Sequence, residues 1–346
     1  MNNILKVFFT DWLVRTFVSR PISSLMDPIR SQCVPVFMLH RMENKSLGIR
    51  GHSAEHIKAA LTFLKDNKYT VVSLRKIFNH LQKGERLPKR AVAFTIDDGF
   101  YEQAEIALPI FESFDAPVTL FIATDLPDLQ AWSWDFKVEY IINSTQLSEF
   151  SLKIKGSTFY AELKNIEDKK KLVNSIRNHL KDIPYEITIE AVTELAEYAG
   201  VKVPCKPPEA YKPMTWEQAI KLESKNVEFG PHSCRHTILS QLPFDVAKLE
   251  ISNSWSRLKE KLEHPVPCFC YPTGRDGLDY GEREKKFVCE VGLKFGLSAE
   301  PGYIDLEQLE NNDLLSLKRF SFPNNLTDFK QYCSWIERAK YLLFNR

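Results

Sequence analysis

Short apolar runs alternate with amphipathic stretches along this sequence, and that alternation constrains the fold more than any other feature. Seven runs have the length and composition of buried strands. They cover residues 35–39, 91–96, 118–123, 227–230, 267–271, 294–298 and 315–320. Stretches with helical periodicity separate them, for example 103–114, 243–262 and 282–291. Strands that alternate with helices are typical of β/α units with a parallel sheet. The pattern therefore predicts an α/β fold.

Residues 125–213 interrupt this alternation. The segment holds two helical patterns, 166–180 and 185–198, with no convincing core strand, and it ends in a run rich in proline. We therefore expect a helical insertion within one catalytic domain that covers residues 33–346. Loops and insertions at the ends of parallel strands often determine specificity in β/α barrels.

Residues 1–32 open with a strongly apolar stretch that Asp11 and Arg15 interrupt. A secretory signal needs an unbroken apolar core and a small-residue cleavage site, and a membrane span needs about 20 apolar residues. We expect an amphipathic helix instead. It either docks on the core or makes peripheral contact with the inner membrane leaflet, and the protein is expected to be cytoplasmic.

The charge balance and the cysteines narrow the function classes. Lys and Arg number 46 against 45 Asp and Glu, a formal net charge of +1, so no global positive field attracts nucleic acid. The chain also lacks a basic cluster with interleaved aromatic residues, and no nucleic-acid partner is expected. Seven cysteines at irregular spacings do not form a disulfide framework and suit a reducing compartment.

The strand at 91–96 ends in two adjacent carboxylates, Asp97 and Asp98, followed by Gly99. Gly99 permits a bend that lets both carboxylates reach one cleft. One carboxylate could then bind a metal while the other acts as a base. The alternative is a loop opening in which Asp98 caps the helix that follows.

A second polar segment follows the strand at 227–230 and contains His232 and His236. On a helical turn this spacing places both imidazoles on one face, where they can bind one Zn²⁺ at about 2.0–2.1 Å. With an aspartate they make three ligands and leave an open position, as catalytic zinc requires. Co²⁺ or Ni²⁺ would fit the same ligands. A closed site that includes Cys234 is the alternative, although a helical turn directs position i+2 away.

A third segment, residues 269–274, reads Phe-Cys-Tyr-Pro-Thr-Gly and closes another apolar run. The backbone N–H near Tyr271 could stabilise an oxyanion. The alternative is a simple Pro-Thr-Gly turn.

Together, these segments resemble the NodB-homology polysaccharide deacetylases, carbohydrate esterase family four, over most of the chain. Residues 95–99 (T-I-D-D-G) are similar to the family's T-F-D-D-G, with Ile96 in place of Phe. Residues 232–236 (H-S-C-R-H) are similar to H-[ST]-x-x-H, and residues 269–274 to F-x-Y-P-x-G. Residues 37–41 are similar to the Y-H-R stretch of bacterial exopolysaccharide members. The resemblance implies a distorted seven-stranded (β/α) barrel.

The resemblance also implies roles for individual residues. Asp98, His232 and His236 would be the metal ligands, and Asp97 the catalytic base. The implied reaction removes N-acetyl groups from an amino-sugar-containing glycan or from a nucleotide- or lipid-linked precursor, in the biosynthesis of a surface polysaccharide. An O-acetyl esterase, or a glycan-binding protein with a relict site, are the alternatives.

Two departures from the family pattern leave parts of this assignment open. Residues 315–318 read L-S-L-K where the family often has L-x-L-H, so the general acid is Lys318, His40 or Asp97 itself. Many members also keep an arginine beside the base, in the strand before Tyr271. Arg319 is the candidate to replace it, with a purely structural arginine as the alternative.

Trp132 and Trp134 stand early in the insertion, followed by Asp135. The tryptophans are either stacking platforms for sugar rings or buried core residues.

Overall fold

The computed structural model describes residues 33–129, 132–306, 313–334 and 336–339. The segment 1–32, expected to form an amphipathic helix, lies outside the described residues. Residues 335 and 340–343, near the end of the helical pattern expected at 326–343, also lie outside the described residues. Within the described residues, no helix combines the length and the apolar character that crossing a membrane requires.

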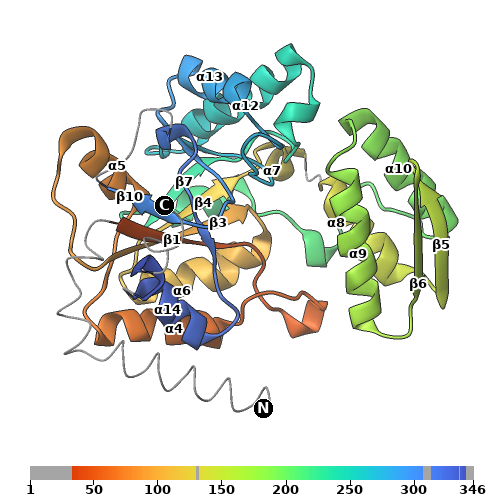
Figure 1. Ribbon diagram of the computed structural model, residues 1–346, viewed down its shortest axis with the longest axis horizontal. Helices are drawn as coiled ribbons and strands as arrows, with labels where there is room; N and C mark the ends of the chain where they lie inside the picture. The colour runs from red at the N-terminus through yellow and green to blue at the C-terminus, as the bar shows by residue number, and fades with distance from the viewer. Residues whose placement is uncertain (1–32, 130–131, 307–312, 335, 340–346) are drawn as a thin grey trace.

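The centre of the fold is a seven-stranded sheet in which the main strands run parallel (Figure 1). β1 (Cys33–Leu39), β3 (Ala91–Asp98), β4 (Val118–Ile122) and β7 (Val227–Pro231) lie in that order. β11 (Phe320–Ser321) also pairs parallel to β1. Two short strands complete the sheet. They are β2 (Thr70–Val71), parallel to β3, and β10 (Tyr303–Asp305), antiparallel to β1.

Hydrogen bonds continue around the remaining side and close the strands into an irregular barrel. β8 (Cys268–Cys270) and β9 (Phe295–Leu297) form a separate parallel pair. Val266 N–H, just before β8, donates to Phe229 O of β7 at 2.7 Å. Leu317 N–H donates to Gly296 O of β9 at 2.8 Å, and the chain then enters β11 beside β1. All seven predicted strands lie on this ring, and the predicted fold class is confirmed.

The helices of the barrel surround these strands (Figure 1). Their bounds are α4 Ala54–Asp66, α5 Leu74–Lys83, α6 Leu108–Ser113, α7 Asp125–Leu129, α11 Trp216–Leu222, α12 Phe244–Lys261, α13 Glu282–Glu290 and α14 Leu326–Cys333. Single turns occur at η1 Lys45–Leu47, η3 Glu209–Tyr211, η4 Leu239–Gln241 and η5 Asp313–Leu315, and a π-helical turn, η2 Gln103–Ala107, precedes α6. The expected cap at Ser53 is present, since its hydroxyl accepts the N–H of His56 at 3.1 Å. α14 ends early because Ser334 adopts an extended backbone.

The insertion folds around a hydrophobic cluster of its own. It contains α8 (Trp134–Ser144), the hairpin β5 (Glu149–Ile154) and β6 (Ser157–Glu162), α9 (Ile166–Leu180) and α10 (Tyr185–Tyr198). Figure 1 shows these elements beside the barrel rather than over it. The hairpin was missed, although residues 149–154 alternate polar and apolar side chains as a half-buried strand does.

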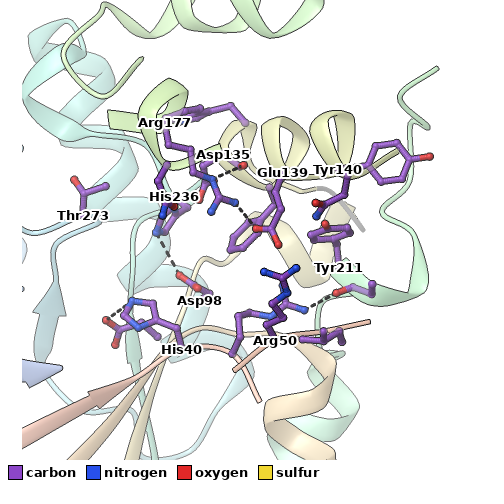
Figure 2. A pocket seen from close by; sticks show the side chains of 18 of the residues that line it. His40, Arg50, Asp98, Asp135, Glu139, Tyr140, Arg177, Tyr211, His236 and Thr273 are labelled. Atoms are coloured by element: carbon purple, nitrogen blue, oxygen red, sulfur yellow. Dashed lines mark hydrogen bonds and ion pairs between the residues drawn. The ribbon is translucent and has the colours of Figure 1, made fainter. Parts of the chain in front are cut away.

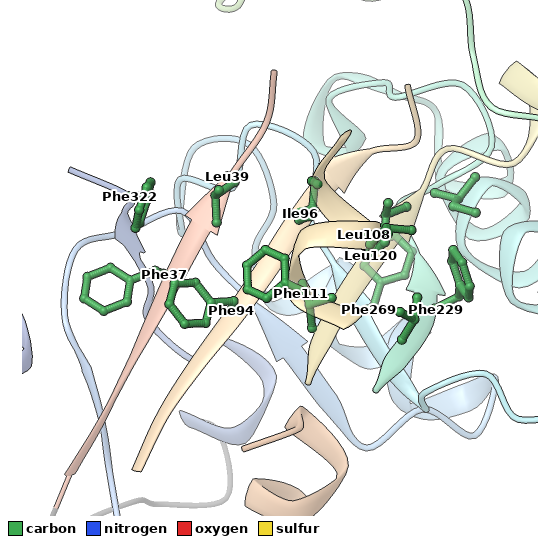
Figure 3. Packing of buried hydrophobic residues seen from close by; sticks show 14 of the residues in the cluster. Phe37, Leu39, Phe94, Ile96, Leu108, Phe111, Leu120, Phe229, Phe269 and Phe322 are labelled. Atoms are coloured by element: carbon green, nitrogen blue, oxygen red, sulfur yellow. The ribbon is translucent and has the colours of Figure 1, made fainter. Parts of the chain in front are cut away.

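Aromatic packing holds the strands that carry the site. Phe37 of β1 lies 5.7 Å from Phe94 of β3, and Phe94 lies 5.1 Å from Phe111 of α6, measured between ring centroids. Figure 3 shows these rings in one layer beneath the strands. Interiors packed this closely resist displacement, so the ends of β1 and β3 form a rigid base for the polar groups described next.

Candidate active site

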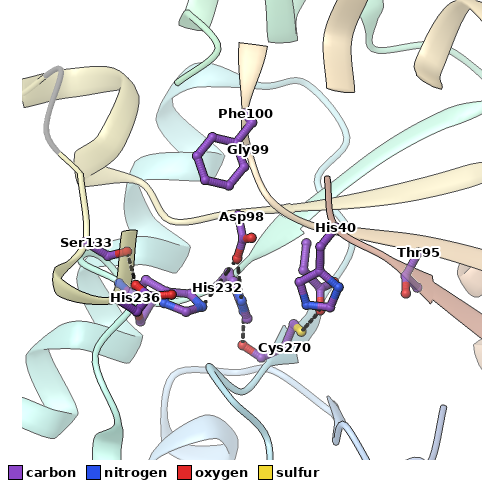
Figure 4. A network of polar contacts seen from close by, with 12 residues as sticks. His40, Thr95, Asp98, Gly99, Phe100, Ser133, His232, His236 and Cys270 are labelled. Atoms are coloured by element: carbon purple, nitrogen blue, oxygen red, sulfur yellow. Dashed lines mark hydrogen bonds and ion pairs between the residues drawn. The ribbon is translucent and has the colours of Figure 1, made fainter. Parts of the chain in front are cut away.

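The polar residues named from the sequence meet at the carboxyl ends of the parallel strands (Figure 4). Asp97 and Asp98 are the last residues of β3, and both side chains are buried. Asp98 and Gly99 both have φ of +90°, a region that strongly favours glycine. This turn at the end of the strand brings both carboxylates to one cleft, as expected.

Asp98 and the two histidines form a group with the spacing of a metal site. Asp98 Oδ1 lies 3.6 Å from His232 Nε2 and 3.3 Å from His236 Nε2. One ligand atom from each residue lies within 4.8 Å of the other two. Asp98 Oδ1 is also buried and accepts no well-formed hydrogen bond in the described part of the chain. Because a buried carboxylate oxygen without a partner is costly, this donor set fits a cation.

The hydrogen bonds and the burial of the two imidazoles determine how they could bind a metal. His232 Nδ1 lies 2.7 Å from Cys270 O. A carbonyl can only accept, so Nδ1 carries a proton, which leaves Nε2 as the nitrogen that faces Asp98. Burial acts to lower the pKa of His232, but Cys270, Asp98 and Asp97 raise it well above the usual value, so a metal would displace a proton from Nε2. Burial lowers the pKa of His236, which favours the neutral ring that a metal ligand must be. Burial opposes the ionisation of Asp98, but His232 and His236 hold its pKa below the usual value.

The histidines do not lie on a helical turn, and this part of the sequence prediction is wrong. Residues 232–236 form a loop in which Ser233 and His236 have φ of 62° and 57°. The loop brings the two rings to 4.9 Å between centroids. The Cys234 thiol points instead to Glu250 O at 3.5 Å, so Cys234 is not part of the group.

A buried carboxylate that the sequence analysis did not identify holds this loop. Glu250 of α12 accepts the N–H groups of Cys234 at 2.9 Å and Arg235 at 3.0 Å, and Arg235 Nε at 2.6 Å. Glu250 lies on the same stripe of α12 as the buried residues Ala247, Ile251 and Ser254. A carboxylate on an apolar helix face was therefore the signal that could have identified it.

Asp97 lies next to Asp98 and is held by a different set of partners. Its Oδ1 accepts Arg319 Nη1 at 2.9 Å, and its Oδ2 lies 3.5 Å from Cys270 Sγ and 3.9 Å from His40 Nε2. Burial acts to raise the pKa of Asp97, but the buried Arg319 guanidinium, aided by His232 and His40, holds it below the usual value. Asp97 is therefore an anion that can accept a proton.

Arg319 lies fully inside the protein, beside Asp97. Besides the carboxylate, it contacts Thr95 Oγ1 at 2.9 Å and donates from Nε to Ser298 O at 2.9 Å. Arg319, which directly precedes β11, thus lies beside Asp97, where the sequence analysis proposed it.

Of the three candidates for the general acid, Lys318 lies away from the cleft. Its side chain packs against Gly302, whereas the side chain of the next residue, Arg319, lies beside Asp97. Lys318 is also absent from the pocket lining, which includes both His40 and Asp97.

Tyr271 is among the residues that line the pocket, but its backbone does not match the expectation. Its N–H donates to Leu297 O at 3.2 Å, which extends the β8–β9 pairing by one residue. The donor expected for an oxyanion is therefore already bonded. The buried ring stacks on Tyr280 with 3.6 Å between centroids, so the side chain of Tyr271 is held in the packed interior.

The cleft opens into a pocket of about 920 Å³ between the strand ends and the insertion (Figure 2). Trp132 and Trp134 are buried, with 5% and 4% of their surface exposed, which favours the core interpretation for Trp132, while Trp134 is buried and also borders the pocket. Asp135 lines the pocket near His236 (Figure 2).

Arg41, next to His40, joins the barrel to the insertion. It pairs with Glu102, donates to Ala210 O, and lies 4.0 Å over the Phe100 ring. Sequence analysis gave Arg41 no role of its own, because its partners are distant in the chain.

Comparison with solved structures places this arrangement among known folds. The deacetylase PplD of Streptococcus pyogenes, solved in complex with acetate, matches with a TM-score of 0.55 at 18% identity, over 85% of this chain and 94% of its own. The chain has the fold of the polysaccharide deacetylases. BC0361, a polysaccharide deacetylase from Bacillus cereus, matches with a TM-score of 0.54 at 14% identity, over 88% and 69%. A de-N-acetylase from Aggregatibacter actinomycetemcomitans matches at 0.52 and 12% identity, over 87% and 99%. No family model and no curated protein match this sequence.

Proposed function

We propose that this protein is a metal-dependent hydrolase that removes N-acetyl groups from an amino-sugar-containing glycan or glycan precursor. The observation that carries the proposal is the buried, unpartnered Asp98 Oδ1 facing two imidazole Nε2 atoms, with the anionic Asp97 beside it. The likeness in fold to a deacetylase solved with acetate and to a de-N-acetylase supports it.

Asp98, His232 and His236 would hold the metal. A divalent ion there supplies Lewis acidity and makes bound water acidic near neutral pH. Zn²⁺ suits an Asp-His-His set best, and Co²⁺ or Ni²⁺ are the other candidates.

The chain's own residues provide the proton transfers. Asp97, kept ionised by Arg319, accepts the proton of the attacking water. His40 is half exposed at the pocket and lies 3.9 Å from Asp97 Oδ2, so either group can return a proton to the leaving amine. Cys270 O fixes the ring of His232 throughout. The products are acetate and a free amine on the sugar.

The setting of the reaction is part of the proposal. We infer a carbohydrate substrate made for a surface polysaccharide in the cytoplasm, either nucleotide- or lipid-linked, with the 1–32 segment available for peripheral membrane contact.

Metal content and acetate release from the full chain test the proposal together. About one metal per chain and metal-dependent acetate release from N-acetylated sugars are expected. Parallel assays with O-acetylated sugars separate an amidase from an esterase. Full metal occupancy and glycan binding without turnover of either acetyl type would indicate a binding protein instead.

A further inference from the structure

One wall of the pocket carries positive charge that the proposed chemistry does not use. The residues that α9 and its flanks contribute to the lining include Asn174, Arg177, Asn178 and Lys181. These positions are spaced i, i+3, i+4 and i+7, so they share one face of the helix. Figure 2 shows Arg177 entering the pocket from this helix and Arg50 entering from the loop that follows β1.

The charges on this side of the pocket are unbalanced. Among the described lining residues from 47–50 and from the insertion, five are cations and two are carboxylates. The cations are Arg50, Lys164, Lys169, Arg177 and Lys181, and the lining carboxylates are Asp135 and Glu139. Two further carboxylates just outside the lining, Glu162 and Glu167, pair with Lys164 and Arg50, so the cations outnumber these four carboxylates by one. The lining itself is predominantly positive, and a concave surface with an excess of one sign concentrates ligands of the opposite sign.

Three of these cations have partners within the insertion itself, although the Lys164–Glu162 pair is exposed, with 73% and 50% of the two side chains accessible. Arg177 binds Glu139 at 2.7 Å, Lys164 pairs with Glu162, and Lys169 donates to Asn143 O at 3.0 Å. The two others are available to a ligand. Lys181 has no recorded side-chain partner in the described part of the chain. Arg50 lies 3.8 Å from Glu167, with 49% and 67% of the two side chains exposed, and exposed pairs of this kind contribute little.

The separation of these two cations limits the ligand. Arg50 lies beside Glu167 in the first turn of α9, and Lys181 follows the last turn. With a rise of 1.5 Å per residue, these helix positions are about 20 Å apart. A single phosphate or diphosphate group is too small to contact both. The exposed amides of Asn174 and Asn178 lie between them on the same face and can hydrogen-bond sugar hydroxyls.

Building on the proposed deacetylase function, we propose that the substrate is an acidic oligosaccharide or polysaccharide that lies along α9. Its anionic groups contact Lys181 and Arg50 at the two ends of the helix, while one acetamido group reaches the cleft at Asp97 and Asp98. The cationic wall thus selects the glycan, and the strand ends perform the reaction.

The test measures binding to the Zn²⁺-loaded full chain by calorimetry and, in parallel, acetate release. The acidic probe is an oligosaccharide of alternating glucuronate and N-acetylglucosamine. An N-acetylglucosamine oligomer of equal length is the neutral probe, and uridine diphosphate N-acetylglucosamine tests a diphosphate source. Lys181→Ala and Arg50→Ala are the variants. Lys171→Ala is the matched control, because Lys171 is an exposed lysine of α9 outside the lining of this pocket.

We expect the acidic probe to bind about tenfold more tightly than the neutral one, with each variant removing much of that difference. Added salt should weaken only the acidic probe, and the control should match the parent. Equal affinity for both oligosaccharides overturns the inference. The inference is also overturned if the nucleotide sugar binds most tightly of the three probes and Lys181→Ala loses that binding.

The outcome also separates this inference from the proposed function. Acetate release without preference for the acidic probe overturns the inference and leaves the deacetylase proposal intact. No acetate from any probe at full metal occupancy overturns the deacetylase proposal, and the binding data then decide whether the wall recognises acidic glycans.

Discussion

The strand ends of the barrel and the α9 wall of the insertion line the same pocket but differ in how their polar groups are satisfied. At the strand ends, Asp97, Asp98 and Arg319 are almost fully buried, and protein groups fix their positions. On the wall, Asn174 and Asn178 are exposed, and Lys181 is only partly buried. Buried, fixed groups suit a reaction that requires exact placement. Exposed donors suit recognition of a ligand, and specificity can change there without altering the chemistry.

The largest expected effect follows removal of the proposed base. Asp97→Asn should reduce kcat by about 10²–10⁴-fold for every substrate, because general base catalysis contributes in that range. Metal content should stay near that of the parent, since Asp97 is not in the Asp98 group. Steady-state kinetics with the acidic and neutral probes check both points. Activity within a few-fold of the parent would remove Asp97 from the mechanism.

Breaking the buried ion pair should cost stability as well as activity. Arg319→Met leaves Asp97 buried without its cation, which costs about 3–5 kcal/mol in the free energy of unfolding at pH 7. The folded pKa of Asp97 is lowered, so the pair stabilises the fold above the unfolded pKa of about 3.9. That contribution is lost as the pH falls through the folded pKa. Urea unfolding at pH 7 and under acid conditions should show the penalty shrinking at low pH. A constant penalty would mean that lost packing, not charge, is responsible.

A smaller effect is expected when the loop that carries the histidines loses its support. Glu250→Ala removes the acceptor for two backbone N–H groups, and we expect metal affinity to fall about 10–100-fold, as for other groups that orient ligands. Glu250→Gln keeps one acceptor oxygen, and its metal affinity should fall less than that of Glu250→Ala. Competition with a chelator measures both. Unchanged metal affinity in Glu250→Ala would show that the loop holds its shape without this carboxylate.

The smallest effect is expected at the junction of the two regions. Arg41→Lys keeps the charge but loses the planar contact over Phe100. Such a contact is worth about 0.5–2 kcal/mol. We expect KM to rise a few-fold while kcat and metal content change little, because the wall shifts and the strand ends do not. A fall in kcat at constant KM would show that the insertion also shapes the catalytic edge.

The residues that sequence analysis found and those it missed differ in how far apart their partners lie in the chain. Asp97, Asp98, His232 and His236 stand in short motifs at strand ends, so their spacing made them candidates, and the family resemblance suggested their individual roles. Glu250 reads as one of many helical glutamates until α12 packs against the loop. β2 and β10 escaped detection because each covers only two or three residues and, unlike β8 and β9, neither lies within one of the apolar runs read as strands.

The α/β class, the seven strands of the barrel and the residues that meet at their carboxyl ends could all be predicted from the amino-acid sequence. These features follow from local hydrophobic periodicity and from motifs a few residues long. Only the tertiary structure decided that a loop with left-handed residues, not a helical turn, presents the histidines. It also decided that the N–H of Tyr271 bonds to Leu297 and that the cations of α9 face the cleft. Those outcomes depend on contacts between segments far apart in the chain, which local patterns do not encode.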